Sequence, residues 1–188
     1  MTLSLISAPA MEPLSLSEVK SWIKVDNNDE DSVIQTLITG ARLAVEASIS
    51  RLLITQQWRL TLDILPDPRF LRLPLTPVQS VQRILVFDPL GADSVLATDS
   101  FSLEAHLDSA RLVWSQAPPL PDAATGGIQI DLTVGYGDAS AVPEPLRIAM
   151  LGLIAQWYAN RGDGDYSSTR MPVGVATLLA PYRIRRLA

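Results

Sequence analysis

Few residues of this chain are arranged for chemistry, and the clearest candidate is the acidic run at 26–31, which reads Asp-Asn-Asn-Asp-Glu-Asp. The calcium loop of an EF-hand needs glycine at its sixth position and glutamate at its twelfth. Counted from Asp26, those positions hold Asp31 and Leu37. The chain also has no cysteine, which excludes disulfides and thiolate ligands. We therefore predict no metal site and no cofactor.

The patterns of catalytic sites are also incomplete. His106 is the only histidine, and no Gly-x-Ser-x-Gly motif accompanies it. The 20 acidic residues leave room for a carboxylate pair of the kind that hydrolyses glycosidic bonds, but the sequence singles out no pair. We predict no catalytic residue and no enzyme.

The segment 133–138 spells Thr-Val-Gly-Tyr-Gly-Asp, the letters of a potassium-channel filter. A filter lies among membrane spans, whereas the longest apolar run, Ile148 to Ala155, is far shorter than the roughly 20 residues that cross a bilayer. The N-terminus lacks the basic region and long apolar stretch of a secretion signal. We therefore expect a tight glycine turn at this segment, no membrane partner and no secretion signal.

Charge is unevenly distributed along the 188 residues, whose net charge is −5. From position 165 onward four arginines stand against one aspartate, which gives +3 and leaves −8 for residues 1–164. An acidic body repels phosphate, so nucleic acid is expected as a passing cargo rather than a tightly held ligand.

Helical patterns lie near both ends of the chain. Ser15-Leu-Ser-Glu18 is a capping box that predicts a short helix to about Val25, and apolar spacing predicts a long helix from the acidic run to about Ser50. Prolines at 143 and 145 predict the start of a third helix, which ends after Asn160.

Between these helices the period changes to two, which is typical of strands. Strands are predicted from about Thr55 and at 70–73, 81–87, 101–104, 111–114 and 128–134, and their spacing suggests an antiparallel sandwich or small barrel. The four tryptophans fall one per element and are predicted to be core anchors; they are Trp22, Trp58, Trp114 and Trp157.

The C-terminal segment 172–188 is apolar and basic and follows a turn-rich polar run at 162–169, which has the composition of a tether. Its prolines and Gly174 disfavour a long helix, so we predict an arm that docks on a partner. The predicted docking residues are Val173, Val175, Leu178, Leu179, Tyr182, Arg183, Ile184, Arg185 and Arg186.

In this order, the segments of the chain resemble the head-tail connector family, also called adaptor or head-completion proteins, of long-tailed phages and gene transfer agents. The resemblance covers most of the chain. It rests on the segments 16–25, 29–31, 53–63, 72–81, 134–138, 142–147, 156–158, 172–175 and 178–183.

The resemblance implies an α+β fold, in which a helical scaffold carries an inserted β domain and a C-terminal docking arm. We expect N-terminal helices at 1–54, the β domain at 55–137, a third helix at 138–162 packed on the first two, and a linker and arm at 163–188. Twelve copies would form a ring at the head-tail junction of the particle, after synthesis in the bacterial cytoplasm. The arm would bind the portal protein, a stopper or tail-terminator protein would follow on the tail side, and DNA would pass through the lumen without sequence-specific binding.

Two other hypotheses come from different classes. The β block could be a binding module for carbohydrate or a receptor, which a stable monomer that binds glycan would favour. A hydrolase with paired carboxylates ranks third and requires turnover that a single Asp or Glu substitution abolishes.

Overall fold

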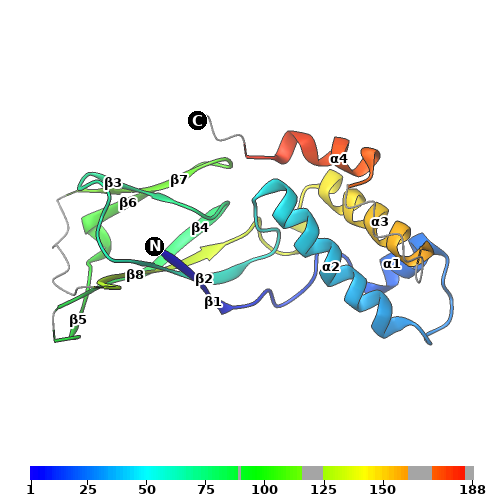
Figure 1. Cartoon of the computed structure of the whole chain (residues 1–188), viewed down its shortest axis with the longest axis horizontal. Coiled ribbons are helices and arrows are strands. Elements are labelled where there is room, and N and C mark those ends of the chain that lie inside the picture. The colour runs from blue at the N-terminus through cyan, green and yellow to red at the C-terminus, as the bar shows by residue number, and fades with distance from the viewer. Residues whose placement is uncertain (89, 116–124, 161–170, 185–188) are drawn as a thin grey trace. The chain divides into compact units, whose positions relative to one another are not determined.

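The computed structural model describes residues 1–88, 90–115, 125–160 and 171–184. Contacts divide the chain into two compact units, and Figure 1 shows the strands of one and the helices of the other. The β unit comprises Met1–Ala10 and Thr55–Tyr136, and the helical unit comprises Met11–Ile54 and Gly137–Ala188. The fold is therefore α+β, as expected.

The helical unit contains four described helices: α1 (Leu16–Ile23), α2 (Asp31–Ile49), α3 (Glu144–Ala159) and α4 (Val173–Leu179). Ser15 begins α1 as predicted, since its hydroxyl accepts a hydrogen bond from the Glu18 N–H at 3.2 Å. The acidic run leads into α2, and Lys20 of α1 pairs with Asp31 at 2.7 Å. The unit's core lies where α2 packs against α3, and its fully buried side chains include Ile34, Ile38, Val45, Leu146 and Ile154.

The β unit consists of two antiparallel sheets, which Figure 1 shows as separate layers. The larger sheet has the strand order β1 (Thr2–Ser7), β2 (Gln56–Leu62), β8 (Ile128–Val134), β4 (Val78–Phe87) and β5 (Asp93–Val95). The smaller sheet has the order β3 (Phe70–Leu73), β7 (Ala110–Trp114) and β6 (Phe101–Ala105).

The register of the larger sheet places apolar side chains in rows. Leu60 pairs with Ile130, and Ile130 pairs with Ile84, so three fully buried side chains lie side by side across β2, β8 and β4. After β8 the chain turns through Gly135 and Gly137, whose φ angles of 117° and 146° are suited to glycine. The glycine turn predicted from the sequence is confirmed.

Three features differ from the sequence-based expectations. The first ten residues belong to the β unit, although we expected 1–54 to be helical, because β1 pairs with a strand more than fifty positions away. The short strand β5 was not predicted. Trp22 is 53% exposed, so its prediction as a core anchor was wrong: α1 is short, and Val19 is its buried residue.

Within the described ranges, we find no helix with both the length and the apolar character needed to cross a membrane.

Candidate assembly interface

The C-terminal segment packs on its own helical unit. Helix α4 lies against α3, as Figure 1 shows, and it buries Leu179 completely and leaves Val175 only 6% exposed. Gly152 of α3 permits this close approach, since a Cβ at that position would lie 3.2 Å from a methyl carbon of Val175. Leu179 and Val175 therefore hold α4 to the chain itself.

Polar contacts fix the end of the segment to the last residue of α2 and to Arg51 just beyond it. The buried Arg51 donates from Nε to the carbonyl oxygen of Tyr182 at 2.7 Å. The Ile184 N–H donates to the Ile49 carbonyl oxygen at 3.3 Å. Charged donors make the stronger hydrogen bonds, so the contact from Arg51 is the main polar anchor of the segment.

The structure separates the nine predicted docking residues into groups instead of placing them on one surface. Val175 and Leu179 face inward, whereas Val173 is 84% exposed. Arg185 and Arg186 lie outside the described residues. The residues left at least partly accessible to a partner are Val173, Leu178, Tyr182, Arg183 and Ile184.

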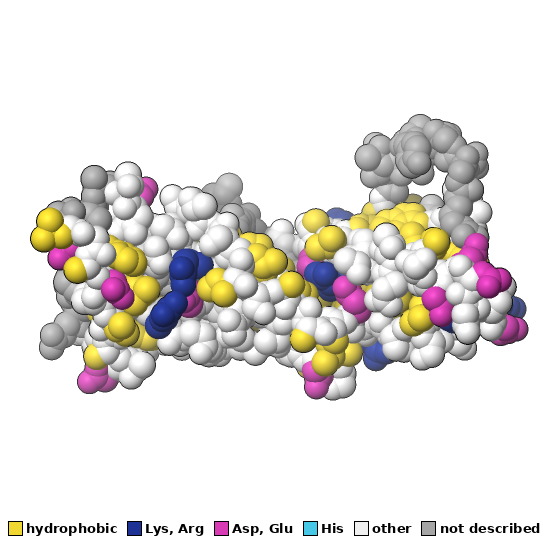
Figure 2. Space-filling view, turned by 90° about the horizontal axis from the view of Figure 1, so that it is seen from below, with side chains coloured by type: hydrophobic (Ala, Val, Ile, Leu, Met, Phe, Trp, Pro, Cys, Tyr) yellow, Lys and Arg dark blue, Asp and Glu magenta, His cyan; other side chains and the backbone are white. Residues whose placement is uncertain are grey.

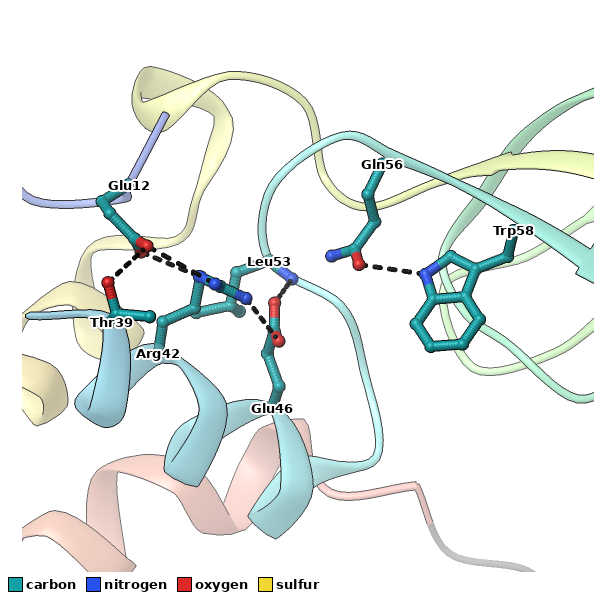
Figure 3. A network of polar contacts seen from close by, with 7 residues as sticks. All are labelled: Glu12, Thr39, Arg42, Glu46, Leu53, Gln56 and Trp58. Carbon is teal, nitrogen blue, oxygen red and sulfur yellow. Dashed lines mark hydrogen bonds and ion pairs between the residues drawn. The ribbon is translucent and has the colours of Figure 1, made fainter. Parts of the chain in front are cut away.

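A polar network joins α2 to Glu12, which precedes α1, and to Leu53, which follows α2 (Figure 3). Arg42 donates to Glu12 at 2.8 Å and to Glu46 at 3.1 Å, and Glu12 also accepts from the Thr39 hydroxyl at 2.9 Å. Glu46 accepts from the Leu53 N–H at 2.8 Å. The network thus anchors residues 12 and 53, which lie close to two of the three points where the chain passes between units.

Burial raises the pKa of Glu46 above its usual value, and the hydrogen bond from Leu53 and the nearby Arg42 oppose that shift. No local pattern indicated this network, because its members are spread over more than forty positions. Its contacts join α2 to the segments that precede and follow it.

A second charged cluster lies on the larger sheet of the β unit. Asp131 of β8 accepts from Arg59 of β2 at 2.7 and 2.9 Å and from Arg83 of β4 at 2.7 Å. The hydrogen bond from Arg59 is the main reason why the pKa of Asp131 lies below its ordinary value. Figure 2 shows Lys and Arg side chains beside an acidic one over this unit.

Within the described ranges, no three His, Cys, Asp or Glu side chains are grouped as metal ligands would be. The described surface instead carries large exposed hydrophobic residues on both units. On the helical unit they include Trp22, Leu43 and Val173, and on the β unit they include Leu5, Ile6 and Val95.

Comparison with known proteins agrees with an assembly role. Residues 13–85 match the model of the phage gp6-like head-tail connector protein family. No significant match was found among curated protein sequences.

Solved structures match over the whole length. The chain is similar to a chain in the neck of an empty gene transfer agent (GTA) particle with C6 symmetry, at 26% identity and a TM-score of 0.86. The match covers 100% of this chain and 98% of the GTA chain. A chain of the native GTA virion gives 27% identity and a TM-score of 0.86, and the native neck with C12 symmetry gives 26% and 0.83, with the same coverage. The chain is thus similar to the gp6-like head-tail connector family over residues 13–85, and to chains of GTA necks and virions over its full length.

Proposed function

We propose that the chain is a structural connector at the head-tail junction of a phage-like particle, where identical copies form a ring beneath the portal. The observation that carries this proposal is the likeness to GTA neck chains over the full length at a TM-score of 0.86. Family members and structural neighbours of this kind are virion components, so the chain acts by binding and not by catalysis.

The ring has twelve copies in this proposal. The neck structures that resemble the chain have C6 and C12 symmetry, and both are compatible with twelve identical subunits. The net charge of −8 over residues 1–164 fits a ring around DNA, since a lumen with surplus negative charge does not trap phosphates. DNA would therefore slide through without being read.

The C-terminal arm makes the joint with the portal. Leu179 and Val175 anchor α4 on its own unit, which leaves the exposed Val173 and Arg183 to meet the portal. An arm that is already docked loses less conformational freedom on binding than a free tail does. Twelve such arms would act together, because each later contact is effectively intramolecular. On the tail side, the β unit would contact a stopper or tail-terminator protein.

The test is electron microscopy and affinity measurement of the purified chain mixed with the portal of the same particle. Removal of the arm after Gly164 should abolish binding, but it also uncovers the α3 surface that Leu179 covers. The sharper variant is Val173→Asp, which changes an 84% exposed side chain and should weaken portal binding at least about tenfold.

Ile64→Asp is the matched control, because Ile64 is 73% exposed and lies in the β unit. Wild-type affinity of Val173→Asp for the portal would contradict the arm's role. A wild-type chain that forms no ring with the portal but binds glycan as a monomer would instead favour a binding module.

A further inference from the structure

Strand β1 forms one edge of the larger sheet and has an open side. In the part of the chain that the structure describes, β1 pairs with β2 alone. Every residue of the strand except the half-buried Leu3 is exposed. Its outer N–H and C=O groups are therefore available to another strand.

The composition of β1 does not protect this edge. Proteins discourage unwanted strand pairing with short edge strands, charged side chains or proline. The edges of the smaller sheet use these devices: β3 has four residues and contains Arg72, and β6 contains Glu104. Strand β1 has six residues, Thr-Leu-Ser-Leu-Ile-Ser, and carries no charge.

Apolar side chains accompany the open edge. Leu5 is 48% exposed and Ile6 is 46% exposed, and the register with β2 shifts between Leu5 and Ser7. Figure 2 shows hydrophobic side chains at the surface of the β unit. An edge that combines free backbone groups with exposed apolar side chains is suited to pairing with another strand.

We propose that β1 adds to the larger sheet of the neighbouring copy in the ring, where it pairs with β5. This inference rests on the proposed ring. In a cyclic ring, each interface joins two different surfaces of identical chains. Strands β1 and β5 are the opposite ends of one five-stranded order, so this pairing would continue the sheet from copy to copy.

Strand β5 is short and has one charge, Asp93, which would face the uncharged β1 without like-charge repulsion. All three of its residues, Asp93 to Val95, are exposed, and Val95 is 66% exposed. Its hydrogen-bonded neighbour among the described strands is β4, which leaves the other side open. Val95 would meet the apolar Leu5 and Ile6 of the neighbour and cover surface that is exposed in the single chain.

The first test blocks the edge. The double variant Leu5→Lys with Ile6→Lys places charges on side chains that are already half exposed, and Ile64→Lys is the matched control at a 73% exposed position of the same unit. With the portal present, the double variant should raise the protein concentration needed for ring formation at least about tenfold, while the control should match the wild type. Ring formation by the double variant at the wild-type concentration would overturn the proposal.

The second test identifies the paired strands and does not depend on how well the lysine variant folds. The chain has no cysteine, so introduced pairs can be read without background. Nine double variants combine cysteine at Ser4, Leu5 or Ile6 with cysteine at one of the three β5 residues. Because disulfides need Cα atoms about 4.4–6.8 Å apart, at least one pair should give a ladder of covalent oligomers under oxidation.

Single-cysteine controls can give no more than dimers. The β1–β5 pairing would be overturned if none of the nine pairs gave a ladder, or if a β1 cysteine linked instead to β1 of another copy or to the portal. In either case, rings of the wild type on the portal would still support the proposed function. A wild-type chain that forms no rings would overturn both.

Discussion

Leu179→Ala tests whether the C-terminal arm is docked on its own chain before assembly. The Leu179 side chain is completely buried where α4 meets α3, and replacing such a leucine by alanine costs about 2–5 kcal/mol. Helix α4 has only seven residues and is otherwise held by Val175 and the polar contacts near Tyr182. The loss should therefore fall on docking of the arm, so α4 opens locally while α2 and α3 stay folded.

Hydrogen exchange measured by mass spectrometry reads this opening directly. Since 1.4 kcal/mol is a factor of ten, amides at 173–184 should exchange at least about 30-fold faster in Leu179→Ala, up to the limit set by free opening of the arm. Val173→Ala is the control, because that side chain is 84% exposed and its loss should change exchange less than about threefold. Equal exchange in the two variants would refute the docked arm.

Three further perturbations test the architecture. Gly137→Ala should destabilise the chain by about 1–3 kcal/mol in urea denaturation, because φ is +146° and the new Cβ would lie 2.7 Å from the Cβ of Ala141. Gly174→Ala on α4 is the control: its new Cβ would have no neighbour within 4 Å, so it should be neutral or stabilising. Asp131 has a lowered pKa in the folded chain, so its contribution to the free energy of unfolding is present above the ordinary aspartate pKa and is lost as pH falls below about 4. Thermal melts of Asp131→Asn should show a smaller loss of stability over this pH range than those of the wild type. Parallel pH profiles of the two proteins would contradict the pairing of this carboxylate with arginine. Glu46 has a raised pKa, so its contribution to the free energy of unfolding is present at low pH and is lost as pH rises through the raised value. The wild type should therefore gain stability relative to Glu46→Gln as pH falls from 7 toward 4.5. A relative loss of wild-type stability over that range would refute the effect of burial.

Local signals in the sequence were sufficient for most elements. Strands β3 and β8 lie at the predicted positions, because each alternates between turn residues and needs no distant information to be recognised. The starts of α1 and α3 were marked by Ser15 and by the prolines at 143 and 145. Signals of this kind act over three or four positions, which is the range that sequence patterns describe.

The candidate interface was harder to predict, because its geometry depends on distant partners. Composition predicted that the arm docks on a partner, but no pattern showed that Val175 would face Gly152 of α3 and so turn inward. The edge strand β1 was not predicted, because its pairing partner lies far away in the sequence: Thr2 pairs with Thr61. Trp22 was assigned to the core by its hydrophobicity, whereas an eight-residue helix buries too narrow a face to include it.

Because the chain alternates between its two units, neither unit can fold until a late part of the chain has been synthesised. Strand β1 is made before β2 and has no partner until β2 has been made, and β2 in turn needs β8, which ends at Val134. Helix α2 likewise waits for α3, at 144–159. Neither unit can close before about two thirds of the chain exists, so both should fold late and nearly together. The uncharged β1 is exposed throughout that interval, so aggregation during translation should depend on Leu5 and Ile6 more than on any residue of the late-made arm.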